Sequence, residues 1–420
     1  MRILLVSEDI PHPQLGGLGR HVLALADELH RRGHKVTLLG QAEGPAQGLD
    51  DQRGPGRFIA DIRGHVRGWG QARLGVYPAW GWRWRAQALS SAIVRHAAGH
   101  DLVHYHGHLP WVGALLPSTL PFTQTRHDQG GDCARSTRVT PAGQRCDSRD
   151  PADCAACATP HPNAAQRWIS THGVRWMRNA TERACRASPP VFVSGFLRDQ
   201  LARVAPAAAP GVVIHNAADR TALQRIVDQR SRSVASTGDG GHRIVCAGAL
   251  FDYKGVGPWL DALAARGLPP GWQVTVVGDG PERPVLQQRH DGAGVQFTGW
   301  RSHDDTLALL AAAHAVVLPS LCDEPCSTVV LEALALGRVV HALRRGGTPE
   351  LARWAGPAAA QRLRLHDDLP DLVDSLLAGG DETQPPDQAL SRFEGDVAAM
   401  VDRLLVHHAR VIERHRQGVR

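Results

Sequence analysis

Short apolar runs alternate along the chain with segments in which apolar positions recur every three or four residues. The run RILLV (2–6) is followed by HVLALADELHRRG, in which Val22, Leu25, Ala26 and Leu29 share one helical face. Continuous apolar runs are typical of strands buried on both faces, as in parallel sheets covered by helices. The beginning of the chain therefore predicts a strand followed by an amphipathic helix.

The same alternation continues in two series. The first series of predicted strands comprises residues 2–6, 35–39, 101–106, 121–125, 191–194 and 211–215. The second comprises residues 243–248, 272–278, 295–299, 315–320 and 338–343. Strands that alternate with helices indicate α/β domains with parallel sheets. Two such series in 420 residues predict two Rossmann-like domains.

Three segments depart from this alternation. Residues 129–165 are polar, rich in Pro and Gly and without periodicity, which predicts an inserted loop; loops of this length are usually functional or disordered. Residues 220–242 are polar, and we expect them to be flexible. Residues 390–420 predict a helix that needs a surface to dock on. Its apolar stripe contains Val397, Met400, Val401, Leu404 and Leu405.

Composition narrows the classes of partner. The formal net charge is +6, but the basic residues are scattered, so a small anionic ligand explains the excess at least as well as a polynucleotide. We expect no nucleic-acid partner. No stretch approaches the roughly 18 apolar residues of a membrane span, and the N-terminus lacks the core of a signal peptide. A cytoplasmic location follows, with the eight cysteines reduced or metal-bound.

The loop after the first predicted strand contains adjacent glycines. GGLGR (16–20) opens a helix, and such glycines let backbone N–H groups approach an anion. A dinucleotide fingerprint would need a glycine where Val22 stands, so an NAD site is not expected. The alternative is a turn that only begins the helix.

The stretch SLCDEPCSTVVLEALALG (320–337) carries two carboxylates. Glu324 lies in the loop at the carboxyl end of a strand, and Glu332 lies in the following helix, which Ser327 or Thr328 can cap. Because ligands of α/β sheets bind at this edge, both carboxylates can border one site. The alternatives are a helix-dipole charge for Glu332 and a solvated loop acid for Glu324.

Lys254 follows the first strand of the second series, in GALFDYKGV. The chain otherwise uses arginine, apart from Lys35. A compact ammonium at a strand end suggests a phosphate contact, although a chance lysine is the alternative.

Five segments resemble the family-4 retaining glycosyltransferases of the GT-B fold. These segments are GGLGRHVLALADELHRRGHKV, VSGFLRDQL with VIHNAAD, GALFDYKG, VVGDGPE and SLCDEPCSTVVLEALALGRVVHALRRGGTPEL, the last with an E-x7-E spacing. The resemblance implies two Rossmann-like domains facing each other across a crevice, with a C-terminal helix that packs back toward the N-terminal domain. The expected boundaries are 1–212 for the acceptor side, 213–390 for the nucleotide-sugar side and 391–420 for the returning helix.

The resemblance also implies roles for single residues. Lys254, Glu324 and His127 would be catalytic. The donor would be bound by Gly17, Arg20, Gly280, Trp300, Arg301, Cys326, Ser327, Thr328 and Glu332. On the acceptor side we expect Asp128, His106 and Trp82, the last from an Arg- and Trp-rich stretch that could instead pack on its domain or contact a membrane. The family's second diphosphate cation is missing, because Ala249 stands in its place.

The implied activity is the retaining transfer of a hexose from a nucleoside-diphosphate donor, with UDP favoured. The expected acceptor is a small hydroxylated molecule such as a cyclitol, aminocyclitol or sugar of specialised metabolism. Catalysis needs no metal, because Lys254 and helix N-termini can stabilise the leaving diphosphate. The alternatives are a lipid-linked acceptor at the membrane surface, a nucleotide-sugar isomerase of the same fold and a non-catalytic sugar-nucleotide binder.

Two further sets of residues resemble metal ligands. Cys133, Cys146, Cys154 and Cys157 include a C-x2-C pair and could bind a structural zinc, with free thiols or disulfides as alternatives. The stretch HYHGH (104–108) places three histidines on one face of a strand end.

Overall fold

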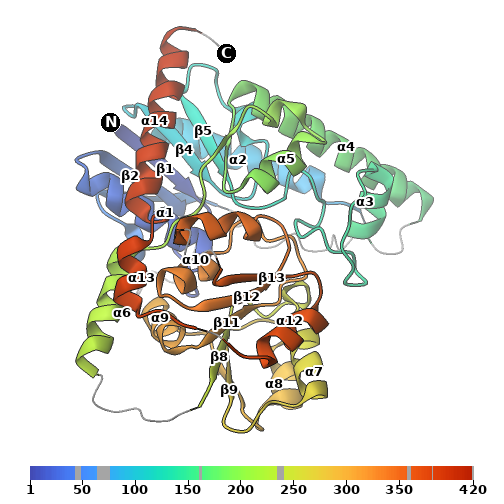
Figure 1. The fold of residues 1–420 in the computed structure, drawn as a ribbon. Coiled ribbons are helices and arrows are strands. Elements are labelled where there is room, and N and C mark those ends of the chain that lie inside the picture. Colours follow the sequence, from blue (N-terminus) through green and yellow to red (C-terminus); the bar gives the residue numbers. More distant parts are fainter. Residues whose placement is uncertain are drawn as a thin grey trace. The chain divides into compact units, whose positions relative to one another are not determined.

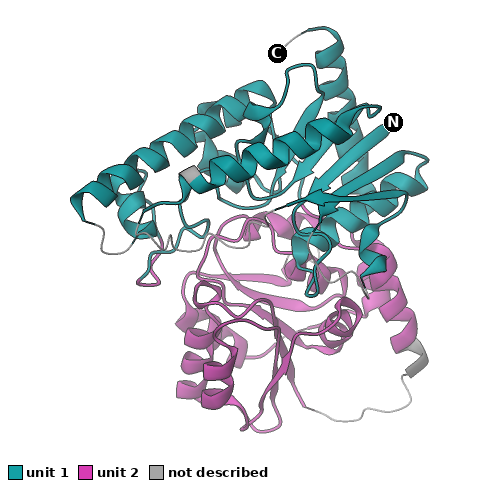
Figure 2. Ribbon diagram, turned by 180° about the vertical axis from the view of Figure 1, so that it is seen from behind, with its two compact units in different colours: residues 1–141, 146–215, 397–420 teal, residues 142–145, 216–396 magenta. Residues whose placement is uncertain are grey.

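The computed structural model describes residues 1–42, 49–63, 76–159, 163–233, 241–356, 361–380 and 382–418, which form two compact units. Figure 2 shows unit 1 (1–141, 146–215 and 397–420) in teal and unit 2 (142–145 and 216–396) in magenta. The chain leaves unit 1 after His215 and returns to it at Val397. The sequence predicts these passages after residues 212 and 390.

Unit 1 is a parallel sheet of seven strands in the order β3-β2-β1-β4-β5-β6-β7. Its strands are β1 (Arg2–Ser7), β2 (Lys35–Gln41), β3 (Arg57–Ile62), β4 (Leu102–His106), β5 (Phe122–Arg126), β6 (Val191–Phe192) and β7 (Val212–Val213). Its α-helices are α1 (Gly17–Arg31), α2 (Ala79–Ala97), α3 (Pro151–Ala158), α4 (Ala164–Ala187), α5 (Gly195–Ala202) and α14 (Val397–Arg416). Strand β1 is fully apolar from Ile3 to Val6 and lies between β2 and β4.

Unit 2 is a parallel sheet of six strands in the order β10-β9-β8-β11-β12-β13. Its strands are β8 (Arg243–Ala247), β9 (Gln273–Val277), β10 (Val295–Gly299), β11 (Ala315–Leu318), β12 (Val339–Leu343) and β13 (Leu363–His366). Its α-helices are α6 (Arg220–Ser233), α7 (Val256–Arg266), α8 (Arg283–His290), α9 (His303–Ala312), α10 (Thr328–Ala335), α12 (Leu369–Leu377) and α13 (Pro386–Arg392). Each unit therefore has the Rossmann-like architecture that its series of apolar runs predicts.

Helix α14 completes unit 1 although it follows unit 2 in the sequence. Figure 1 shows it, in red, among the blue and cyan elements of unit 1, and it packs against α1 and β5. The buried stripe contains Val397, Met400, Val401 and Leu404, as the periodicity predicts, and extends to His407 and His408. The returning helix of the predicted fold is thus confirmed.

Two segments are more ordered than their composition predicts. The first half of 220–242 forms α6, because Ala222, Leu223, Ile226 and Val227 make a buried stripe, so the expectation of flexibility is wrong there. The insert also contains a helix, α3, whose N-terminus is capped by the Asp150 carboxylate.

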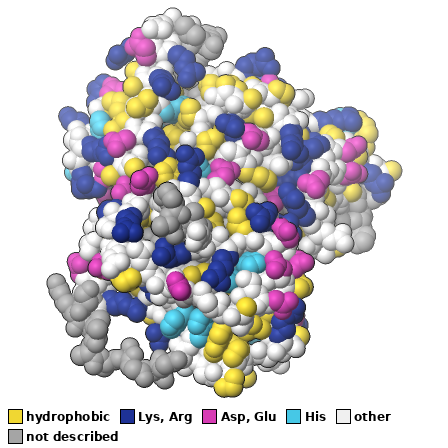
Figure 3. Space-filling model, viewed as in Figure 1, with side chains coloured by type: hydrophobic (Ala, Val, Ile, Leu, Met, Phe, Trp, Pro, Cys, Tyr) yellow, Lys and Arg dark blue, Asp and Glu magenta, His cyan; other side chains and the backbone are white. Residues whose placement is uncertain are grey.

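The distribution of charged side chains on the surface and the apolar character of the helices bear on whether the chain could bind a polyanion or cross a membrane. Basic and acidic side chains are interspersed over the face drawn in Figure 3. Among the described residues, no helix combines the length and apolar character needed to cross a membrane.

Candidate functional site

The centre of the candidate site in unit 2 is an ion pair between two predicted catalytic residues. Lys254 ends the 3₁₀ helix η4 (Asp252–Lys254) after β8, and Glu324 lies in the loop after the adjacent strand β11. Lys254 Nζ donates to Glu324 Oε1 at 2.6 Å, and the Ser320 hydroxyl donates to the same oxygen at 2.6 Å. The carboxyl ends of neighbouring strands thus bring together two residues that lie 70 positions apart.

The pair determines the charge state of both groups. Burial alone would raise the pKa of Glu324, but the Lys254 charge and the hydrogen bonds from Lys254 and Ser320 outweigh it and lower that pKa. Burial alone would lower the pKa of Lys254, and the neighbouring Glu324 carboxylate raises it instead. An ammonium and a carboxylate are therefore both present at neutral pH, with one quarter of the lysine side chain (26%) accessible.

Two backbone contacts fix the Glu324 loop. Gly347 N–H donates to Glu324 O at 2.7 Å, and Gly346 has a φ of +57°. A Cβ at Gly346 would lie 2.2 Å from Glu324 O, so the turn requires glycine. On the other side of the loop, Asn216 Nδ2 donates to Cys326 O at 3.1 Å. The sequence pattern did not reveal this role of Asn216.

Glu332 lies in α10, is 5% exposed and contacts His303. Its Oε1 lies 2.8 Å from His303 Nε2, at the beginning of α9. The carboxylate is thus oriented by a histidine that no sequence motif indicated. Ser327 is the N-cap of α10 and Thr328 its first residue, and the Ser327 side chain makes no capping hydrogen bond. The first N–H groups of α10 are therefore not capped by that hydroxyl.

The other predicted donor residues of unit 2 lie at further strand ends. Gly280 follows β9, where a Cβ would lie 2.3 Å from Leu250 O, so the two strand-end loops approach as closely as glycine allows. Trp300 and Arg301 follow β10, and both are exposed. Cys326 is buried in the Glu324 loop.

In unit 1, a second polar cluster lies at the carboxyl ends of β4 and β5. His108 contacts Asp128 Oδ2 through Nδ1 at 2.7 Å and Asp9 Oδ1 through Nε2 at 3.3 Å. Burial would lower the pKa of His108, but the two carboxylates outweigh it and raise that pKa well above its usual value. Asp128 therefore belongs to a charged group that also includes His108, which the sequence analysis did not assign to the site.

His106 and His127 lie beside this charged group. His106 Nδ1 is 3.1 Å from His127 Nε2, and His21 of α1 packs edge-on against His127. Burial lowers the pKa of His21 to about 4 and those of His106 and His127 well below the usual value. All three rings are therefore neutral at pH 7.

The remaining predicted residues of unit 1 have structural contacts. Gly17 begins α1, and Arg20 Nη1 donates to Leu15 O of the glycine-rich loop at 3.0 Å. Trp82 is 4% exposed and packs against Tyr77 and Trp111 in the core, so it presents no ring face to an acceptor.

The four cysteines of the insert lie in one neighbourhood. Burial raises the pKa of Cys157 to about 11, and the thiols of Cys133, Cys146 and Cys154 contribute to this rise. However, among the described residues, the one group of three or more possible ligands within 4.8 Å of one another is His21, His106 and His127. A zinc bound by the cysteines therefore stays a prediction.

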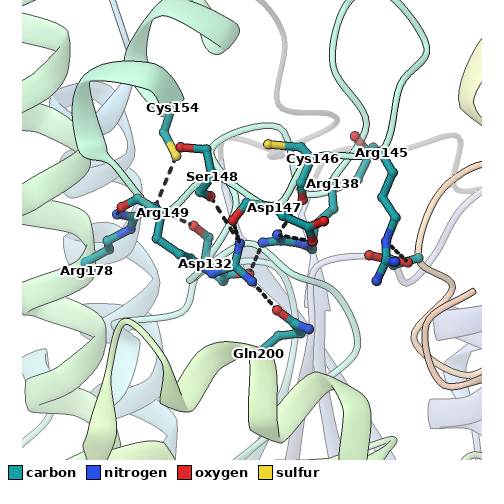
Figure 4. Close-up of polar contacts among 12 residues, drawn as sticks. Asp132, Arg138, Arg145, Cys146, Asp147, Ser148, Arg149, Cys154, Arg178 and Gln200 are labelled. Carbon is teal, nitrogen blue, oxygen red and sulfur yellow. Dashed lines mark hydrogen bonds and ion pairs between the residues drawn. The ribbon is translucent and has the colours of Figure 1, made fainter.

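The insert is held by arginines that surround one buried aspartate. Figure 4 shows Arg138, Arg149 and Arg178 around Asp132. Arg138 Nη1 donates to Asp132 Oδ2 at 2.7 Å, and both side chains are 2% exposed. Arg178 Nη2 donates to Asp132 O at 3.1 Å and contacts Cys154 Sγ at 3.2 Å. Buried charge pairing thus orders this part of the insert.

Comparisons with known proteins agree with the fold. Residues 15–222 match the family model for Glycosyltransferase Family 4, and residues 241–378 match the model for Glycosyl transferases group 1. The glycogen synthase of Mycobacterium tuberculosis is 28% identical over 383 residues, which cover 83% of this chain and 80% of the relative.

Solved structures show the same architecture. Alr3699/HepE from Anabaena, in complex with UDP and glucose, is 19% identical with a TM-score of 0.64 over 97% of this chain and 99% of its own. AviGT4, a glycosyltransferase of avilamycin A biosynthesis, is 20% identical with a TM-score of 0.56 over 98% of each chain. The two parallel sheets and the family matches define a glycosyltransferase of the GT-B fold. More specifically, the chain belongs to glycosyltransferase family 4.

Proposed function

We propose that this glycosyltransferase moves a hexose from a UDP-sugar to a small hydroxylated acceptor, such as a cyclitol, aminocyclitol or sugar, with retention of the anomeric configuration. The observation that carries the donor proposal is the arrangement at the strand ends of unit 2. Lys254 and Glu324 form an ion pair there, and Glu332 is oriented by His303. The complex of the similar Anabaena protein with UDP and glucose supports a nucleotide donor.

Each group of this arrangement suits one part of such a donor. The Lys254 ammonium contacts the loop that leads into α10, and this ammonium and the N-terminus of the helix both favour an anion such as the diphosphate. The Glu332 carboxylate can accept hydrogen bonds from ribose hydroxyls. Glu324, fixed by Ser320 and the Gly346 turn, can accept from sugar hydroxyls.

The chemistry that we propose follows from the leaving group. As the glycosidic bond to the diphosphate breaks, negative charge grows on the departing oxygen and Lys254 stabilises it. The acceptor hydroxyl attacks the same face of the sugar, and its proton passes to the departing diphosphate. No residue of the chain needs to form a covalent bond with the sugar.

Calorimetric titration with UDP-, GDP-, ADP- and dTDP-sugars tests the donor proposal. We expect UDP-sugars to bind at least about tenfold more tightly than the others, which corresponds to about 1.4 kcal/mol. Incubation with the preferred donor and candidate acceptors, followed by NMR of the product, then tests transfer and its stereochemistry. Binding of none of these donors would reject the donor site, and release of UDP with an isomerised sugar in the absence of an acceptor would indicate an isomerase.

A further inference from the structure

Five histidines lie near the carboxyl ends of β4 and β5 in unit 1, and they divide into two classes. His104 and His108 have both ring nitrogens engaged. His104 Nε2 contacts Thr125 Oγ1 at 2.8 Å, and its Nδ1 contacts His408 at 3.0 Å. His108 is held between two carboxylates, as described above. Neither histidine has a nitrogen available to a ligand in this arrangement.

The other three, His21, His106 and His127, are less completely engaged. The Nε2 atom of His21 is buried without a hydrogen-bond partner, and the contact between His106 and His127 uses one nitrogen of each ring. Burying a polar atom without a partner costs about 1–3 kcal/mol, so such atoms call for a physical reason. One nitrogen from each of the three rings lies within 4.8 Å of one nitrogen of the other two.

The topology explains why these three converge. His106 is the last residue of β4, and His127 directly follows Arg126, the last residue of the neighbouring strand β5. His21 lies in α1, the helix that follows β1, and β1 is the other neighbour of β4. Three neighbouring strands, or the segments that follow them, thus supply one imidazole each. The ring of His106 also packs against the fully buried ring of His104, tilted by 41° with centroids 4.0 Å apart, which limits its movement.

We propose that His21, His106 and His127 bind a divalent transition-metal ion of the zinc class. Zinc–nitrogen bonds of about 2.0–2.1 Å in a tetrahedral site place two ligand nitrogens roughly 3.3 Å apart. His106 Nδ1 and His127 Nε2 lie 3.1 Å apart, which is already this spacing. Three imidazoles are a known zinc ligand set that leaves one position for water or another oxygen ligand. This inference depends on side-chain geometry and not on the proposed transfer activity, and it replaces the catalytic role that the family resemblance implies for His127.

Cobalt substitution provides the test. The full chain is freed of metal, kept reduced and titrated with Co²⁺, whose visible absorption reports coordination. We expect Co²⁺ to bind tightly at the histidine site of the unaltered chain and at least about 100-fold more weakly there in His21→Ala, because one of three ligands is lost. Zn²⁺ should raise the thermal unfolding midpoint of the unaltered chain by more than that of the variant. This second measurement also shows whether His21→Ala is folded.

Two controls make the outcome specific. His172→Ala removes an exposed histidine of α4 and should leave the visible band unchanged. Cys154→Ser removes a ligand of the cysteine set and should leave the part of the band that comes from the histidine site unchanged, because that site contains no thiolate. The proposal is overturned if folded His21→Ala binds Co²⁺ as tightly as the unaltered chain when both also carry Cys154→Ser, or if Cys154→Ser alone abolishes all visible absorption of bound Co²⁺.

Discussion

At the scale of single residues, the contact between Lys254 and Glu324 links charge state to the proposed chemistry. A lysine at a strand end is ambiguous in a sequence, since a chance lysine and a phosphate ligand look the same. The structure places its ammonium 2.6 Å from a buried carboxylate whose backbone is fixed by the Gly346 turn. The residue is therefore held at one point, as stabilisation of a leaving group requires.

Replacing Lys254 tests this role. Lys254→Met removes the proposed partner of the diphosphate and should lower kcat/KM by about 100- to 1,000-fold. It should also destabilise the fold by about 1.5–3 kcal/mol, because Glu324 loses a charged hydrogen bond. Steady-state kinetics and urea unfolding measure the two effects. Lys35→Met, at the exposed start of β2, is the matched control and should change neither. Activity of Lys254→Met within threefold of the unaltered chain would reject the assignment.

At the scale of elements, sequence patterns predicted buried central strands better than strands at sheet edges, and better than side-chain contacts between different elements. The strands β3 and β13 were missed because both lie at sheet edges and polar residues interrupt their apolar positions, unlike the continuous runs of central strands. Lys254 and Glu324 could be predicted from strand-end positions, since parallel strands end at one edge. His303 could not, because its contact with Glu332 depends on how α9 packs beside α10.

Helix α14 makes the stability of the protein depend on pH. Burial lowers the pKa of His407 to about 4 and that of His408 to about 3. Both pKa values lie below the value of about 6.5 that histidine has in an unfolded chain. Below pH 6.5 the unfolded state therefore binds more protons than the folded state, and the free energy of unfolding falls. Above pH 6.5 the histidines are neutral in both states, and their contribution to the pH dependence vanishes. At pH 5, keeping each of these histidines neutral in the folded state lowers the free energy of unfolding by about 2 kcal/mol.

Urea unfolding at pH 7.5 and pH 5.0 tests this dependence. The loss of stability between the two pH values should be about 2 kcal/mol smaller in His408→Asn than in the unaltered chain. His172→Asn, which replaces an exposed histidine, should show the full loss. An equal loss in all three proteins would contradict the prediction.

The insert is the second element with a testable property. We propose that its four cysteines bind a structural zinc, because they include a C-x2-C pair and Cys133, Cys146 and Cys154 all influence the pKa of Cys157. After Co²⁺ substitution, thiolate-to-cobalt charge transfer should appear in the near ultraviolet. It should be lost in Cys154→Ser and retained in His21→Ala, the reverse of the pattern for the histidine site. The proposal is rejected if the folded chain contains no metal, is no less stable for lacking it, and all four insert thiols react with a thiol reagent.

At the scale of the whole molecule, each unit has its own sheet and its own core. The buried cluster of unit 2 includes Trp259, Val276, Val317 and Leu372, all from within residues 216–396. We therefore expect a fragment of residues 216–396 to unfold cooperatively on its own and to bind UDP. Calorimetry measures both properties, and the same fragment with Lys254→Met should keep the transition and lose binding. A fragment without a cooperative transition would show that unit 2 depends on the rest of the chain.

The return of α14 to unit 1 also has a consequence for biosynthesis. Unit 2, apart from residues 142–145, is continuous in the chain and can fold as soon as residue 396 has left the ribosome. Unit 1 begins first but must wait for residues 397–416, which supply His408 to His104 and His407 to Thr123. During translation, the faces of β4 and β5 that α14 covers stay open until residues 397–416 have been made. Chaperones that recognise exposed apolar surface would therefore bind a nascent chain that is halted before residue 397.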